Sequence, residues 1–144
     1  GLEYYSGDDG LNFAWMTGGA SGFISVVTHV ASAHYRRMIE LLDTDQVWEA
    51  RELSYSLRPL VHAIMGGGQG AVMAKYALWL QGVIDSPAVR LPMVGISDDE
   101  VSALRRALCA AALLLIVYLS DTRGAGSSHG LVDETEHGPL HAQV

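Results

Sequence analysis

Residues 23–27 have the sequence Phe23-Ile24-Ser25-Val26-Val27, an almost uniformly apolar and β-branched run. Such a run is typical of a strand buried on both faces, as in a parallel sheet covered by helices. Upstream, Leu2–Ser6 is short, aromatic and flanked by glycine, which also predicts a strand. We expect one helix between the two strands, over Leu11–Thr17, and another after them, over Ala31–Leu42. The order strand, helix, strand, helix predicts an α/β fold.

The chain after this segment is predicted to be helical. A long helix is expected from a cap at Asp43 or Thr44 to about Met65, with a kink at Pro59. Its apolar side chains recur every three or four residues, at Val47, Ala50, Leu57, Val61 and Ile64. The run Gly66–Gly70 follows a helix and lacks the ending of a phosphate-binding loop, so we interpret it as a helix stop and a linker to the next helix, Ala71–Gln81.

The last helix is expected over Asp98–Leu119. Ser97 and, three residues later, Glu100 have the spacing of a capping box. The apolar run Ala107–Leu119 predicts a helix buried against the one that ends at Met65, with Leu108 and Leu115 in the contact. From Asp121 onward the composition changes to Gly, Ser, Asp, Glu and His. Because such a segment has too little apolar surface to fold, residues 120–144 are expected to form a disordered tail.

The composition sets limits on the partners of the chain. It has 144 residues, of which 49% are apolar and 17% charged, enough for a hydrophobic core. The net charge of −7 argues against a nucleic-acid or anionic-membrane partner. The longest apolar run has 13 residues, whereas a membrane span needs roughly 20. With one cysteine, Cys109, no internal disulfide can form. With no signal peptide visible, we expect a cytoplasmic protein without a membrane anchor.

Ser6-Gly7-Asp8-Asp9 stands at the carboxyl end of the first predicted strand, where α/β proteins build their sites. Gly7 would let a ligand approach the backbone closely. The adjacent carboxylates of Asp8 and Asp9 could act as a general acid and a general base if their surroundings give them different pKa values. The alternative is a tight turn in which Asp9 caps the next helix. His29 is in turn either a general acid or base, or part of a helix N-terminus.

Two further groups are candidates for functional sites. Lys75 lies on a predicted helix, and nothing near it in sequence would lower the pKa of its amine, so we interpret it as a surface or interface lysine and not as a nucleophile. In the tail, His129, His137 and His141 stand among acidic residues. Their spacing fits no compact metal motif, so we interpret this segment as solvated and expect no metal and no cofactor.

Three motifs occur in order: Tyr5-Ser6-Gly7-Asp8-Asp9, then Gly19-x-x-Gly22-Phe23-Ile24-Ser25-Val26, then Arg90-Leu91-Pro92-Met93. Together they resemble the C-terminal half of dihydrodipicolinate synthases, especially actinobacterial ones, within the N-acetylneuraminate lyase family of pyruvate-dependent class I aldolases. The resemblance covers residues 1–115. It implies a C-terminal fragment of a (β/α)₈ barrel plus a helical domain. Residues 1–43 would form the last two βα units of the barrel, and residues 44–119 the C-terminal helical domain.

The resemblance also implies a chemistry. In the family, a barrel lysine forms a Schiff base with pyruvate, and the resulting enamine attacks an aldehyde, here aspartate semialdehyde, in lysine biosynthesis. Gly7 would line the pyruvate site through its backbone, and Ile24 would contact the keto acid. Asp8 and Asp9 would shape the nearby loop. The Schiff-base lysine and the proton-relay residues of the family precede the matched segment, so we expect no catalytic residue in this chain and no activity from it alone.

Two alternatives stay open beside this reading. The chain could belong to another pyruvate-dependent aldolase, such as one acting on 2-keto-3-deoxy sugar acids. It could also be a non-catalytic half-barrel that acts only with a partner chain. In each case a two-stranded piece of a barrel has bare edges. We therefore expect either a homo-oligomer or association with the missing barrel half.

Overall fold

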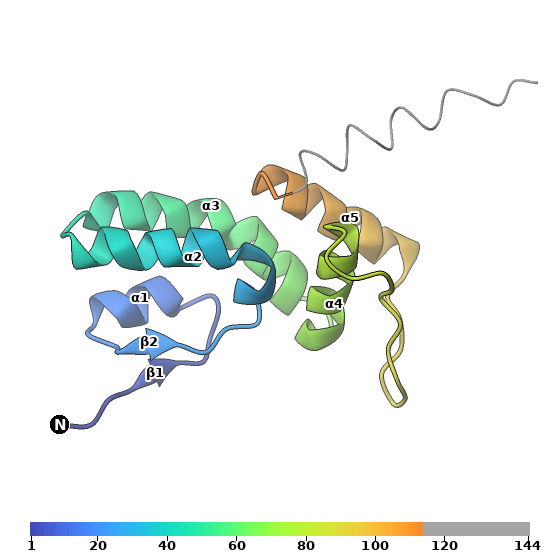
Figure 1. Ribbon diagram of the computed structural model, residues 1–144, viewed down its shortest axis with the longest axis horizontal. Helices are drawn as coiled ribbons and strands as arrows, with labels where there is room; N and C mark the ends of the chain where they lie inside the picture. The colour runs from blue at the N-terminus through green and yellow to red at the C-terminus, as the bar shows by residue number, and fades with distance from the viewer. Residues whose placement is uncertain (114–144) are drawn as a thin grey trace, which may run out of the picture.

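The computed structural model describes residues 1–113, which form two short strands and five helices. In chain order these are β1 (Tyr5–Ser6), α1 (Asn12–Thr17), β2 (Gly22–Phe23), α2 (Thr28–Asp43), α3 (Val47–Met65), α4 (Gly70–Leu80) and α5 (Asp98–Ala110). Figure 1 shows the strands at one end of an elongated molecule, with α1 between them and the neighbouring helices α2 and α3. At the other end, α4 and α5 pack against α3. None of the helices described is long and apolar enough to cross a membrane.

The two strands pair in parallel, with Tyr5 opposite Gly22 and Ser6 opposite Phe23. This confirms the predicted order strand, helix, strand, helix. Both strands are shorter than predicted. The strand expected over Leu2–Ser6 is observed as Tyr5–Ser6, and the strand expected over Phe23–Val27 is observed as Gly22–Phe23. The pairing ends where the Ile24 amide donates to the Ser6 carbonyl at 2.8 Å. Beyond that point the backbone amides of Val26 and Val27 bond to a side chain instead of a strand.

The predicted helix over Ala31–Leu42 is present but begins earlier, at Thr28. Ser25 explains the early start, because its hydroxyl accepts from the Thr28 amide at 3.1 Å and its carbonyl accepts from the Thr28 hydroxyl at 2.9 Å. The backbone at Ala31 is not helical (φ −129°, ψ 29°), so a first turn precedes the regular helix.

The start of α3 differs from the predicted cap at Asp43 or Thr44. Asp43 is the last residue of α2, and the N-cap of α3 is Gln46, without a side-chain hydrogen bond. The chain turns at Asp45, whose positive φ of 58° ends α2 sharply. From Val47, α3 continues through Pro59 to Met65. As predicted, the glycine-rich run ends α3 and leads into α4.

Four helices end in the same hydrogen-bond pattern, the Schellman motif. In each, a residue with positive φ follows the C-cap, its amide bonds three residues back, and the next amide bonds five residues back. The positive-φ residues are Gly19, Asp45, Gly82 and Ala112. At Ala112 the motif ends α5, so the expected helix over Asp98–Leu119 stops at Ala110. Leu115 and the expected tail, residues 120–144, lie outside the described residues.

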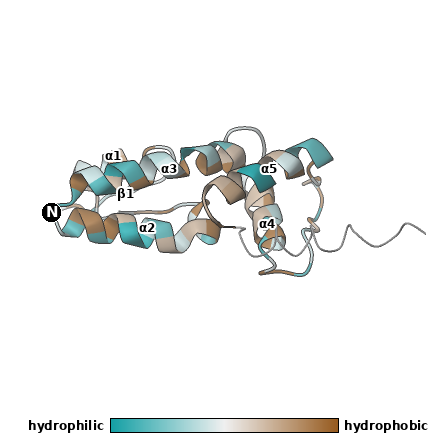
Figure 2. Ribbon diagram, turned by 90° about the horizontal axis from the view of Figure 1, so that it is seen from above, coloured by the Kyte–Doolittle hydropathy of each residue, from teal (hydrophilic) through white to brown (hydrophobic). Residues whose placement is uncertain are grey.

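The hydrophobic core lies between the helices. As expected, α5 packs against α3, and Leu108 is fully buried. Figure 2 shows hydrophobic and hydrophilic residues alternating along α3 and α5, as in helices with one buried face. The largest apolar side chains with less than 2% exposure are Val27, Met38, Leu57, Leu60, Ile64, Leu104 and Leu108.

Candidate functional site

Gly7 and Ile24 lie next to each other, each one residue beyond the end of its strand. Parallel pairing places the carboxyl ends of β1 and β2 at the same edge, as the sequence predicted. Both residues are exposed, Ile24 to 77%. A Cβ at Gly7 would meet no atom within 4 Å. Gly7 also lines a pocket of about 430 Å³ together with Tyr4 and Trp15. This edge of the sheet is therefore open to a ligand or another chain.

Asp9 is buried, and its carboxylate holds the segment between β2 and α2. It accepts hydrogen bonds from the Ser25 hydroxyl, from the Val26 amide at 3.0 Å and from the Val27 amide at 3.4 Å. The predicted role of Asp9 as the cap of the first helix is wrong, because the N-cap of α1 is Leu11 and makes no side-chain hydrogen bond. The carboxylate instead binds amides beside the start of α2, where the helix dipole favours a negative charge.

Two buried side chains connect Asp9 to β1. The Ser6 hydroxyl donates to Asn12 Oδ1 at 2.7 Å, and Asn12 Nδ2 donates to Asp9 Oδ1 at 3.5 Å. Ser6, Asp9 and Asn12 are the buried polar residues of the described chain. Asp8 is exposed, and its carboxylate accepts only from the Gly10 amide, at 2.8 Å. The neighbouring carboxylates thus differ fully in burial and in partners. Sequence reasoning missed Asn12, although a short amide side chain in the first turn of a helix is often hydrogen-bonded locally.

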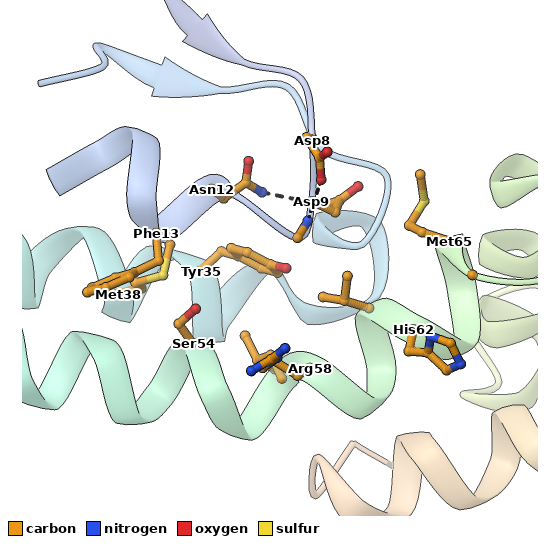
Figure 3. A pocket seen from close by; sticks show the side chains of 14 residues that line it. Asp8, Asp9, Asn12, Phe13, Tyr35, Met38, Ser54, Arg58, His62 and Met65 are labelled. Atoms are coloured by element: carbon orange, nitrogen blue, oxygen red, sulfur yellow. Dashed lines mark hydrogen bonds between the residues drawn. The ribbon is translucent and has the colours of Figure 1, made fainter. Parts of the chain in front are cut away.

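A pocket of about 300 Å³ lies beside the turn that contains Asp8 and Asp9. As Figure 3 shows, side chains of α2 and α3 complete it, among them Tyr35 and Arg58. Burial raises the pKa of the Tyr35 phenol, and the negative charge of Asp9 raises it further, so the phenol stays protonated. Sequence reasoning also missed Tyr35, because nothing in the local pattern separates it from the other apolar positions of α2.

The remaining candidates from the sequence lie elsewhere. His29 is an exposed residue in the first turn of α2, which fits its interpretation as part of a helix N-terminus. Lys75 lies on α4, and its Nζ donates to the carbonyl of Ala88 in the loop before α5. The tail histidines lie outside the described residues. Within residues 1–113, no group of three His, Cys, Asp or Glu side chains could hold a metal ion.

The comparisons with known proteins agree with one another. The family model described as "Dihydrodipicolinate synthetase family" matches residues 1–111. The chain is 44% identical over 114 residues to 4-hydroxy-tetrahydrodipicolinate synthase of Bifidobacterium longum, covering 79% of this chain and 38% of that protein. Dihydrodipicolinate synthase of Thermotoga maritima superposes with a TM-score of 0.73 at 32% identity, over 78% of this chain and 37% of the other.

A further solved structure is dihydrodipicolinate synthase of Acinetobacter baumannii complexed with pyruvate, with a TM-score of 0.71 and 27% identity over 78% of this chain and 38% of that one. The chain thus spans less than two fifths of the length of the relatives it matches. The family match nevertheless includes both strands and all five described helices. For this reason the chain belongs to the dihydrodipicolinate synthetase family.

Proposed function

We propose that this chain supplies the C-terminal part of a 4-hydroxy-tetrahydrodipicolinate synthase, which condenses pyruvate with aspartate semialdehyde in lysine biosynthesis. The observation that supports this most is the 44% identity to a synthase of that name over 114 residues, together with the family match over residues 1–111, which include Gly7 and Ile24. In this proposal the two residues form the edge of the keto-acid site contributed by the last two strands of the barrel. The Schiff-base lysine comes from a part of the barrel that these 144 residues do not contain.

The exposed strands support association with further strands. Leu2, Tyr5 and Ile24 are exposed to 100%, 54% and 77%. Within residues 1–113 the sheet has two strands, so the outer edges of β1 and β2 have no described strand partner. Open edges and apolar strand residues recruit other strands. In our proposal the chain therefore binds the remaining part of a barrel or, in its absence, a second copy of itself.

A complementation experiment tests this function. The chain is mixed with the portion of the Bifidobacterium longum synthase that precedes the matched segment, and condensation is assayed with pyruvate and aspartate semialdehyde. Each piece alone should be inactive, and the mixture should be active. Borohydride trapping with labelled pyruvate should label the added portion and leave this chain unlabelled. A reduced adduct on Lys75 of the chain alone, or a stable but inactive complex, would contradict the proposal.

Gly7 offers a sharper variant within that assay. A Cβ at this position meets no atom within 4 Å, so Gly7→Ala should leave the unfolding of the isolated chain unchanged. In the complemented enzyme the added methyl should raise the KM for pyruvate about tenfold, because it blocks close approach of the keto acid to the backbone. Gly67→Ala is the matched control, since it also has free space but lies in the linker before α4. It should change neither property.

Association is tested on the chain alone by light scattering coupled to size exclusion at several concentrations. We expect a mass that exceeds the monomer and rises with concentration. A sharp monomer that is independent of concentration and unfolds cooperatively would contradict the open-sheet interpretation. The sugar-acid aldolase alternative is tested by assaying the complemented enzyme with a 2-keto-3-deoxy sugar acid. Cleavage of that compound in place of condensation with aspartate semialdehyde would favour the alternative over the synthase.

A further inference from the structure

The pocket between the Asp8–Asn12 turn and helices α2 and α3 is separate from the proposed keto-acid edge. It has a volume of about 300 Å³, and neither Gly7 nor Ile24 lines it. In Figure 3, Asp8 and Asp9 lie on one side of the pocket and Arg58 on the other, with Tyr35 between them. The pocket thus presents acceptors and a cation to the same half-open space.

Tyr35 points to a ligand in this pocket. The residue is 4% exposed, yet its hydroxyl makes no hydrogen bond to any described residue. The hydroxyl oxygen is not among the fully buried unpartnered atoms of the described residues, which are His34 Nδ1 and Arg51 Nε, so a small molecule can reach it. A reachable hydroxyl without a protein partner bonds to a water or to a ligand. The pocket is the space from which that partner can reach the hydroxyl. Because the phenol stays protonated, it can both donate and accept a hydrogen bond.

The charges around the pocket favour a ligand that carries both signs. Asp8 is an exposed carboxylate with one hydrogen bond, and the charge of Asp9 acts on Tyr35. Arg58 makes no ion pair with a described residue, and its guanidinium lies 5.6 Å from the centre of the Tyr55 ring. An anion in the pocket would face the carboxylates, and a cation would face Arg58. A ligand with an ammonium and a carboxylate satisfies both ends.

The wall between these charged ends is apolar, with Met38, Leu57 and Val61 among the lining residues. We propose that this pocket binds a small zwitterionic amino acid with an apolar side chain. The ammonium lies against Asp8 and the Tyr35 oxygen, the carboxylate lies against Arg58, and the side chain lies on the apolar wall. A second charge on the ligand side chain, as in lysine, would be placed against that wall and would weaken binding.

The test is a titration of the full ¹⁵N-labelled chain followed by NMR, with equilibrium dialysis of labelled ligand where association broadens the signals. The probes are L-leucine, L-lysine, 4-methylpentanoate, which lacks the ammonium, and 3-methylbutylamine, which lacks the carboxylate. Leucine should give saturable shifts at the amides of Asp9, Tyr35 and Arg58, and the other three probes should bind more weakly.

Two variants and a control complete the design. Tyr35→Phe should weaken leucine binding about fivefold, and Arg58→Gln about tenfold or more, as expected for neutral and charged hydrogen bonds. Because the Tyr35 hydroxyl has no protein partner, Tyr35→Phe should leave the urea midpoint unchanged. Arg36→Gln, at an exposed position of α2, is the matched control and should bind leucine normally.

Several outcomes would overturn the inference. These are an absence of saturable shifts at the pocket, leucine binding that neither variant weakens, and lysine or 4-methylpentanoate binding as tightly as leucine. The inference stands apart from the proposed function, because Gly7→Ala should leave leucine binding unchanged while it impairs the complemented enzyme. If complementation fails while leucine binds, the proposed function is wrong; if leucine fails to bind while complementation succeeds, the pocket inference is wrong.

Discussion

Residues 1–26 and residues 27–113 bury opposite kinds of side chain. In the first region the buried residues are Ser6, Asp9, Asn12 and Ala20, and their polar groups bond to one another. In the second region the buried side chains are apolar apart from the Tyr35 hydroxyl. The first region also leaves large apolar side chains exposed, among them Leu2 and Ile24. The first region is held by hydrogen bonds to a carboxylate and by the partly buried Phe13, Phe23 and Val26 against the core, and the second region by the core itself.

The difference shows which part of the molecule depends on its surroundings. The helices α2 to α5 share a buried apolar core, although Trp48 on α3 and Leu91 in the loop before α5 stay exposed. The strands contact α1, while Tyr5 on β1 and Ile24 just beyond β2 remain more than half exposed. The polar network around Asp9 keeps the ends of the two strands in place next to the core. Stability and local order should therefore respond differently to changes in the two regions.

The largest expected effect comes from the apolar core. Leu108→Ala removes a fully buried side chain between α5 and α3 and should lower the free energy of unfolding by about 2–5 kcal/mol. Urea unfolding followed by circular dichroism measures the change. Leu91→Ala deletes the same atoms from a side chain that is 88% exposed, and it should shift the midpoint little. Equal shifts for the two variants would contradict the described core.

Asp9→Asn should have the next largest effect, confined to the first region. An amide nitrogen would face the backbone donors of Val26 and Val27, where the carboxylate accepts. Losing charged hydrogen bonds of this kind costs about 1.5–3 kcal/mol. Hydrogen exchange should become faster at residues 22–28, while the amides of α5 keep their protection. Asp8→Asn is the matched control, because Asp8 is exposed and its carboxylate bonds only to the Gly10 amide. Uniformly faster exchange in both regions would mean that they are not separable.

The same contrast explains what the sequence could predict. Helical periodicity and the Ser97–Glu100 spacing are local signals. From them the sequence predicts both ends of α3 and α4 and the start of α5 to within a few residues, but not the end of α5. The strand order was predicted because β-branched runs and glycine breaks are also local. The strand lengths were wrong, because the end of β2 depends on Asp9, which is 16 residues before Ser25. No pattern within one segment contains such a contact.

The site follows the same rule. The position of Gly7 and Ile24 at one edge followed from parallel pairing, which the sequence predicts. The pairing of Asp9 with the start of α2 and the approach of Tyr35 to Arg58 depend on how α2 and α3 pack. The end of α5 was missed for another reason, since Ala112 adopts a positive φ that is usual for glycine and unusual for alanine. Composition gave no sign of this stop.

Substitutions at the positive-φ residues Ala112 and Gly82 should change the stability of the chain less than the two substitutions above. Alanine at a positive φ destabilises the folded chain by roughly 1–2 kcal/mol, a cost that glycine does not have. Glycine is instead more flexible in the unfolded chain, which lowers stability by about 0.4–1 kcal/mol. Ala112→Gly should therefore stabilise the chain by about 0.5–1 kcal/mol. Gly82→Ala makes the reverse change at the equivalent position after α4, where an added Cβ meets no atom within 4 Å. It should destabilise the chain by a similar amount. Thermal unfolding measures both, and changes of the same sign would contradict the Schellman assignment.

The smallest effect concerns Glu100, which like Asp9 is a carboxylate near the start of a helix. Its Oε2 accepts from the Ser97 amide and the Ser97 hydroxyl, both at 2.8 Å, and these hydrogen bonds lower the pKa of Glu100 below 4.5. Because the folded pKa lies below the unfolded one, the contribution of the carboxylate to stability is present above about pH 4.5 and is lost as the pH falls through the folded value.

Glu100→Gln should therefore lower the urea midpoint slightly at pH 7 and leave it equal to that of the parent chain once the pH is below the folded pKa of Glu100. The effect should be smaller than that of Asp9→Asn, because Glu100 is only partly buried whereas Asp9 is buried, so water can replace the hydrogen bonds that Glu100 loses. Asp98→Asn, in the same first turn but outside the capping box, is the control. A larger loss for Glu100→Gln than for Asp9→Asn would mean that burial does not decide how strongly a carboxylate holds a helix start, and the contrast between the two regions would fail.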